Sequence, residues 1–66
     1  MFCVEYTKGN RSRVLFSSED EAAAIQKGNE EQARLRAAGK HGIITLYTMT
    51  TERGEPMRKC LCFWEV

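Results

Sequence analysis

Long hydrophobic runs, histidines and an excess of charge of one sign are absent or nearly absent from this 66-residue chain. No stretch approaches the roughly 18 apolar residues of a membrane-spanning helix. The first ten residues lack the basic start and the apolar centre of a signal peptide. We therefore expect a cytoplasmic protein without a membrane segment.

The charges nearly cancel, because ten lysines and arginines stand against nine aspartates and glutamates, which leaves a net charge of +1. Such a balance creates no strong field to attract nucleic acid or an acidic membrane, although it permits a local basic patch. Hydrophobic residues make up 42% and charged residues 29% of the chain, proportions that are typical of a folded domain.

The three cysteines are an odd number, which favours a reducing compartment over a disulfide scaffold. Cys60 and Cys62 lie two residues apart in a predicted strand, which separates their Cα atoms by about 6.6–7 Å. Sulfurs around one zinc ion lie within roughly 4 Å of each other, so this pair does not suit a metal. A bridge from Cys3 to either one requires the first and last strands to be neighbours. We predict no metal site and no cofactor.

Candidate catalytic residues are few. His41 is the only histidine and follows the predicted helix, where its cation would interact favourably with the helix dipole. Glu19, Asp20 and Glu21 open that helix and are explained by the same dipole. No Ser-His-Asp or Cys-His set follows from the spacing, so we expect a protein that is not an enzyme.

Hydrophobic periodicity predicts one domain over residues 1–66, with elements in the order ββαββ. The predicted strands and helix span about residues 2–7, 12–17, 19–38 (the helix), 42–50 and 57–65. This order occurs in unrelated proteins and therefore indicates no function by itself.

The first predicted hairpin turns at Lys8-Gly9-Asn10. A three-residue turn there sets Val4 opposite Val14 on one face of the sheet. A two-residue Gly9-Asn10 turn would shift the register by one and send Val14 and Phe16 to the other face. We therefore predict the three-residue turn.

The helix is predicted from its end signals. Ser18 followed by Glu21 is typical of a capping box, and Gly39 is a natural stop. Gly28 lies within the apolar stripe, where a missing side chain lets the helix sit close over bulky rings. The alternative is a break at Gly28-Asn29, because glycine costs about 1 kcal/mol relative to alanine inside a helix.

The second predicted hairpin has a four-residue loop, Glu52 to Glu55. This loop would set Leu46 opposite Leu61 and Ile44 opposite Phe63. The other face would then pair Ile43 with Trp64, Thr45 with Cys62, and Tyr47 with Cys60.

One helix covers only one face of a four-stranded sheet, so we expect an α+β fold with a mostly antiparallel sheet and one open face. The strand order stays undetermined. The covered face is predicted to comprise Phe2, Val4, Tyr6, Val14, Phe16, Ile44, Leu46, Leu61 and Phe63, beneath Ile25, Gly28 and Leu35 of the helix. The open face is predicted to comprise Cys3, Leu15, Ile43, Tyr47, Met49, Cys60, Cys62 and Trp64, among Glu5, Thr7, Arg13, Thr45 and Arg58.

An open face of this apolar character is typical of an interaction site. Our hypothesis is a small non-enzymatic interaction or regulatory protein that forms a homodimer, or binds another protein, through this face. A partner would also stabilise a chain whose own core supplies no more than about 3–5 kcal/mol. The predicted interface residues are Trp64, Tyr47, Ile43, Met49, Cys60, Cys62 and Leu15.

The alternative hypothesis is binding of RNA or single-stranded DNA through the same face, because aromatic rings flanked by basic residues can stack bases and contact phosphates. The residues predicted for this role are Tyr47, Trp64, Arg13 and Arg58. The nearly neutral charge and the aliphatic residues among the aromatics favour the dimer.

Overall fold

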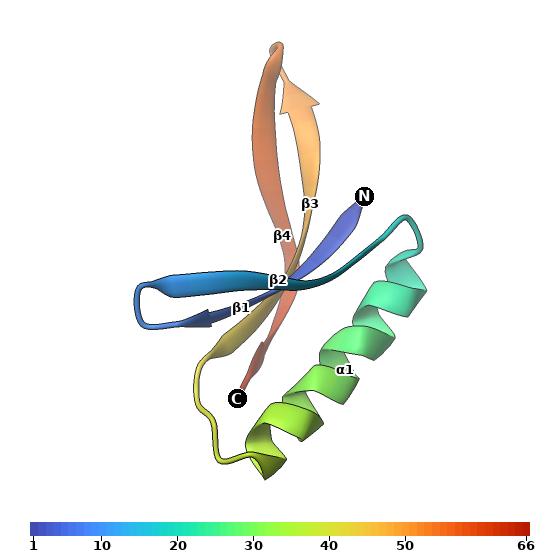
Figure 1. Ribbon diagram of the computed structural model, residues 1–66. Coiled ribbons are helices and arrows are strands. Elements are labelled where there is room, and N and C mark those ends of the chain that lie inside the picture. The colour runs from blue at the N-terminus through green and yellow to red at the C-terminus, as the bar shows by residue number, and fades with distance from the viewer.

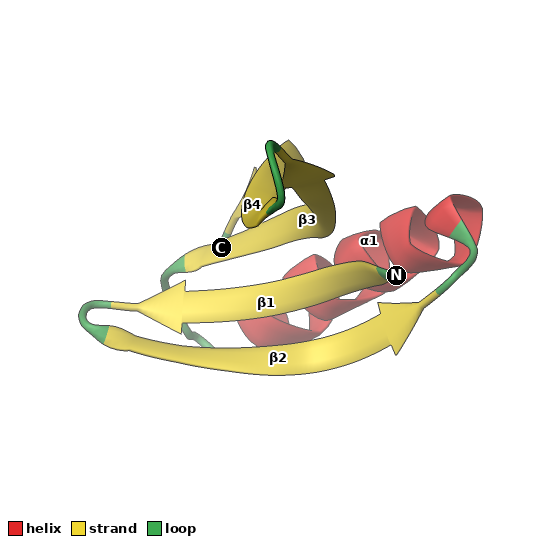
Figure 2. Ribbon diagram, turned by 90° about the horizontal axis from the view of Figure 1, so that it is seen from above, coloured by secondary structure: helices red, strands yellow, loops and turns green.

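A computed structural model describes residues 1–66 and confirms the α+β class, with four strands in one sheet and a single helix on one side (Figures 1 and 2). The elements are β1 (Phe2–Lys8), β2 (Arg11–Ser18), α1 (Glu21–Ala37), β3 (Ile43–Glu52) and β4 (Glu55–Glu65). The helix is continuous through Gly28 and Asn29. No helix is long and apolar enough to cross a membrane.

The strand order, which the sequence left open, is β2-β1-β3-β4. Every neighbouring pair is antiparallel. The β2–α1–β3 connection passes over β1, which fills the gap between β2 and β3, so no two parallel strands are neighbours. β2 and β4 are the two edge strands of the sheet.

The helix begins two residues later than a Ser18 capping box requires. Asp20 is the N-cap, and its Oδ1 accepts a hydrogen bond from the Ala22 N–H at 3.0 Å. Ser18 instead accepts a hydrogen bond from the Asp20 N–H at 3.0 Å, which holds the chain as it leaves β2. The predicted capping box is therefore wrong, because Asp20, an equally good N-cap residue, occupies the cap position and Ser18 still belongs to β2.

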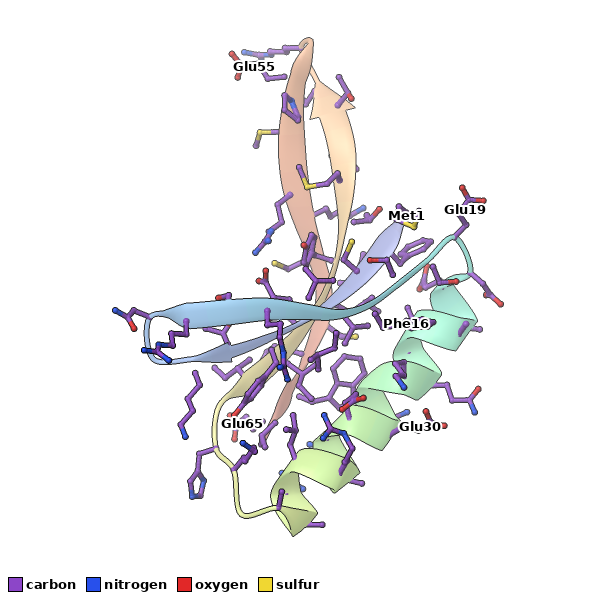
Figure 3. All side chains as sticks on the ribbon, viewed as in Figure 1. Met1, Phe16, Glu19, Glu30, Glu55 and Glu65 are labelled. Carbon is purple, nitrogen blue, oxygen red and sulfur yellow. The ribbon has the colours of Figure 1, made fainter.

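The predicted three-residue turn in the first hairpin is wrong. Lys8 pairs with Arg11, so the turn has two residues, and Gly9 adopts the left-handed φ of 63° that such a turn requires. A β-bulge at Leu15 then reverses the alternation, because Val4 pairs with Phe16 and Glu5 with Val14. Phe16 thus reaches the helix, as Figure 3 shows, whereas Val14 lies on the open side with 48% exposure.

The predicted four-residue loop of the second hairpin is also wrong. Glu52 pairs with Glu55, and the two turn residues Arg53 and Gly54 both have positive φ, 53° and 80°. Such a pair is typical of the two-residue type I′ turn, which matches the twist of the strands. The shorter turn leaves the predicted register intact as far as the pair of Tyr47 with Cys60.

A second bulge, at Leu61, decides which side chains of β4 face the helix. Beyond it, Cys62 pairs with Leu46, Phe63 with Thr45, and Trp64 with Ile44. Residues paired across strands project to the same face. Trp64 and Cys62 are therefore on the helix side, whereas Leu61 and Phe63 are exposed, so the predicted faces of these four residues are wrong.

The core is small and lies between the sheet and α1. Eight of the 66 residues are buried. The central cluster consists of Val4, Ala24, Leu35, Ile44 and Leu46, with Phe2, Tyr6, Phe16, Trp64 and Val66 packed against it. Ile25, predicted to face the sheet, is 38% exposed, because Ala24, Gly28, Glu31 and Leu35 form the inner side of the helix.

Trp64 packs directly against Gly28. A Cβ atom on Gly28 would lie within 2.5 Å of Cζ2 and Cζ3 of the indole ring, and the indole N–H donates to Asn29 Oδ1 at 2.8 Å. The expectation that Gly28 lets the helix sit over a bulky ring is confirmed. Gln32 and Arg36 continue this contact by donating to the Glu65 carbonyl at 2.8 and 2.9 Å.

The β3–β4 hairpin projects beyond the rest of the sheet (Figure 1). β1 pairs with β3 only as far as Thr48, so the remaining residues up to the Arg53-Gly54 turn form a two-stranded arm. Figure 3 shows Glu55 at its tip. The radius of gyration is 12.3 Å, against about 11 Å expected for a compact domain of this length.

We predict that Gly28→Ala destabilises the protein by about 1–2 kcal/mol. The overpacking against Trp64, typically about 1–3 kcal/mol, exceeds the gain of about 1 kcal/mol in helix propensity. Urea unfolding followed by Trp64 fluorescence measures the change. Glu30→Ala, on the exposed side of the helix, is the control and should leave the midpoint nearly unchanged. Equal midpoints for Gly28→Ala and the wild type would contradict the packing described.

Candidate interaction surface on the open face

An apolar groove of about 380 Å³ lies on the open side of the β3–β4 hairpin. Phe63 is its most exposed large side chain, at 64%, and Ile43 is 45% exposed. The groove is lined by Ile43, Thr45, Cys60, Leu61, Cys62 and Phe63. The bulge at Leu61 creates it, because it turns Phe63 outward and places two large apolar side chains side by side.

A polar cluster closes the open face next to this groove. The Arg58 guanidinium lies 3.8 Å from the centroid of the Tyr47 ring and reaches Glu5, with Nη1 and Nη2 donating to the two carboxylate oxygens at 3.2 and 3.4 Å. The three residues come from β4, β3 and β1, so this cluster ties three strands together. The guanidinium covers the ring, and Tyr47 is only 7% exposed.

Burial of the ring raises the pKa of Tyr47, and the nearby Cys3 raises it further. Arg58 acts in the opposite direction, since its cation favours the phenolate. The hydrogen bond to Glu5 raises the pKa of Arg58, which keeps that side chain charged. Desolvation of the thiol also raises the pKa of Cys62, which disfavours the nucleophilic thiolate form.

The structure brings together only part of the predicted interface. Tyr47 pairs with Cys60, and Ile43 and Met49 lie on the same side of β3. Trp64 is separated from them by the sheet itself, because the bulge turned it toward the helix, whereas Cys62 pairs with Leu46 but still lines the groove. Leu15 is the extra residue of the β2 bulge and lies two strands away from the groove.

The residues predicted for nucleic-acid binding do not form a stacking platform. Trp64 is packed on Gly28. The accessible side of Tyr47 is covered by Arg58. Arg13 pairs with Tyr6, on the helix side of the sheet. Bases need exposed ring faces on which to stack. None of the predicted residues presents an exposed ring on the open face, and Phe63, whose ring is exposed there, was not among them.

Sequence reasoning missed Phe63 and Leu61 as surface residues. The Glu52-Arg53-Gly54-Glu55 sequence, in which glycine at the second turn position favours a two-residue turn, could have given the turn length but not the faces of these residues. That turn alone would have kept Leu61 opposite Leu46, which is the pairing predicted from the sequence. The bulge that brings Phe63 to the open side has no such local signal.

No group of three or more histidine, cysteine, aspartate or glutamate side chains could hold a metal ion. The three cysteines are free. His41 contributes its backbone carbonyl, which accepts a hydrogen bond from the Tyr6 hydroxyl. Comparison of the chain with protein-family models, curated protein sequences and solved structures finds no match.

We predict that Tyr47 makes stability depend on alkaline pH. A raised pKa in the folded state means that the unfolded chain releases the phenolic proton first, so the free energy of unfolding falls as the pH rises above about 10. Tyr47→Phe removes this contribution but retains the ring beneath Arg58. Urea unfolding between about pH 9 and pH 11.5 should show a shallower decline for the variant. Parallel curves would show that Tyr47 titrates alike in both states.

Proposed function

We propose that this protein is a small non-enzymatic interaction or regulatory module that self-associates through the open side of the β3–β4 hairpin. The observation that carries the proposal is the uncovered apolar groove, in which Phe63 is 64% exposed. Exposed apolar surface of this kind is costly in water and is typical of a site that a partner covers.

The shape of the molecule supports self-association. Its accessible surface is 4680 Å², whereas a compact monomer of this mass exposes about 4,300 Å². The excess is consistent with the arm beyond Thr48, since a two-stranded hairpin without a third strand is only marginally stable in water. A partner across the open side would supply the packing that the small core lacks.

The three free cysteines also fit the reducing conditions of the cytosol, where we propose that the protein acts. Binding of RNA or single-stranded DNA is less well supported, because Tyr47 and Trp64 are covered. The nearly neutral net charge likewise provides little electrostatic affinity for a polyanion.

The proposal is tested by size-exclusion chromatography with light scattering over a wide concentration range. We expect a mass of twice the 7.6 kDa of one chain at high concentration, decreasing on dilution. A short oligonucleotide is then added at two salt concentrations. A strict monomer at all concentrations would disprove self-association, and a monomer that binds the oligonucleotide in a salt-sensitive way would support the nucleic-acid alternative instead.

We predict that Phe63→Ser weakens self-association by about tenfold or more, because interface anchors commonly cost about 2 kcal/mol on truncation. Val14→Ser is the matched control. Val14 is also exposed on the open side, at 48%, but it lies on β2, at the opposite edge of the sheet from β4. The dissociation constant of each variant is obtained from sedimentation equilibrium. If both substitutions weaken the dimer equally, Phe63 is not an anchor.

A further inference from the structure

Positive charge without an ion-pair partner is concentrated at one end of the molecule. Only three of the ten lysines and arginines form ion pairs with acidic side chains. Four exposed cations without such a partner lie on the β1–β2 hairpin and on the loop that follows α1. We call this group the basic corner, and it consists of Lys8, Arg11, Arg13 and Lys40.

The strand register places three of these cations on one face of the hairpin. Lys8 pairs with Arg11 next to the two-residue turn, and Arg13 pairs with Tyr6, which packs against the core beneath the helix. Paired residues, and residues two positions apart in a strand, project to the same face. Lys8, Arg11 and Arg13 therefore lie on the helix side, with neighbouring Cβ atoms about 4.5–8 Å apart.

Tyr6 also joins Lys40 to this group. Its hydroxyl donates to the carbonyl of His41, and the backbone of Gly42 lies against its ring, where a Cβ atom would be 2.7 Å from Cε1. The loop that carries Lys40 is thus held against the ring whose neighbour on β2 is Arg13. Figure 1 shows the β1–β2 turn and this loop away from the tip of the β3–β4 arm.

No acidic side chain balances the basic corner. None occurs in residues 6–18 or 32–51. Glu5 and Glu65 belong to other parts of the sheet nearby, but Glu5 is bonded to Arg58 on the open side. Glu65 pairs with Ile43 and is also on the open side. The sheet therefore separates both carboxylates from the corner.

This arrangement of like charges is unfavourable in the absence of an anion. Lys8 and Arg11 lie directly opposite each other, and like charges in such a pair destabilise a hairpin. Figure 3 shows two further acids well away from the corner, Glu19 just before the helix and Glu55 at the tip of the arm. An anionic ligand bound at the corner would relieve this repulsion.

We propose that the basic corner binds the phosphate backbone of a nucleic acid without regard to base sequence. The corner lies on the helix side, so self-association through the open side leaves it accessible, and the inference goes beyond the proposed function. The net charge of +1 sets the long-range field, whereas the affinity at close range comes from the cations that contact phosphates.

The composition of the corner favours phosphates over an anionic lipid surface. The guanidinium groups of Arg11 and Arg13 each have a planar fork of donors that matches two phosphate oxygens. A hairpin that inserts into a membrane needs apolar side chains. The turn from Lys8 to Arg11 contains only Gly9 and Asn10. The corner therefore fits a nucleic acid better than a membrane.

This mode of binding differs from base stacking on the open face. Stacking needs exposed rings, and both Tyr47 and Trp64 are covered. Contacts to phosphates need only accessible cations. Tyr6 packs against the core and its hydroxyl is bonded, so it offers no free ring to a base. Binding at the corner is therefore independent of base sequence.

The first experiment measures the binding of a fluorescently labelled DNA duplex of mixed sequence, and of one of its single strands, by anisotropy. We expect the logarithm of the association constant to fall with the logarithm of salt concentration with a slope of about −3 to −4, the value for four phosphate contacts. A second duplex of unrelated sequence should bind equally. No binding at about 50 mM salt, or a strong preference for one duplex, would overturn the inference.

The second experiment compares two double variants that lower the net charge equally. Arg11→Gln/Arg13→Gln removes two cations of the corner, and Arg53→Gln/Lys59→Gln removes two exposed cations of the arm. We expect the corner variant to lose at least about tenfold in affinity at low salt and about 2 in slope, and the arm variant to resemble the wild type. Equal losses would show that only net charge matters and would overturn the corner as a site.

Two further variants keep this test independent of one protein's folding. Arg11→Lys/Arg13→Lys retains the charge and should retain the slope, and Lys8→Gln/Lys40→Gln should lose about as much slope as the glutamine variant of the arginines. Circular dichroism and Trp64 fluorescence confirm that each variant is folded. A folded lysine variant without salt-dependent binding would contradict the electrostatic contact.

Competition separates nucleic acid from other anions. Poly-glutamate and vesicles that contain phosphatidylserine are added to the labelled duplex at equal concentrations of negative charge. We expect unlabelled duplex to displace the probe at lower concentration than either, because guanidinium groups match phosphate oxygens and the duplex has a high charge density. Equal displacement by poly-glutamate or by vesicles would overturn the assignment to nucleic acid.

The outcomes also separate this inference from the proposed function. The mass of the wild type in solution tests self-association, and the corner variants should not change that mass. A dimer that fails to bind the duplex supports the proposed function and disproves the basic corner as a site. A monomer whose binding is lost in Arg11→Gln/Arg13→Gln has the opposite meaning for both.

Discussion

The contact between the Trp64 ring and Gly28 is the constraint on which the rest of the arrangement depends. The ring occupies the space that a side chain at position 28 would need, and its N–H is bonded to Asn29. This contact anchors the end of β4 beneath the helix, together with the bonds to the Glu65 carbonyl. Because β4 is an edge strand, it has only one neighbouring strand, and the helix supplies its second attachment.

Anchoring Trp64 inward has a consequence at the other end of β4. The two-residue turn at Arg53-Gly54 sets a register in which regular alternation would place Trp64 on the open side. The bulge at Leu61 resolves this conflict by inserting one residue between the two parts of the strand. The same insertion exposes Phe63 beside Ile43. Stability of the helix packing and exposure of the groove are therefore two results of one backbone irregularity.

The nearly neutral charge and the small core fit the proposed self-association, which would rest on packing rather than on electrostatic attraction. The polar cluster of Glu5, Tyr47 and Arg58 limits the apolar area to the groove. A limited apolar area favours one defined contact over nonspecific association. This groove is the surface through which we propose that a second copy of the chain binds.

The sequence by itself determined the ββαββ order, the single helix-covered face and the role of Gly28, because hydrophobic alternation, end signals and a missing side chain are local properties. It also placed Val4, Phe16, Ile44 and Leu46 in the core. It did not determine the strand order, the turn lengths or the faces of Val14, Leu61, Phe63 and Trp64. The faces of Leu61, Phe63 and Trp64 depend on the bulge in β4, which forms only where tertiary packing favours an inward ring enough to break the alternation. The candidate surface lies where that packing acted, so its residues could be identified only from the tertiary structure.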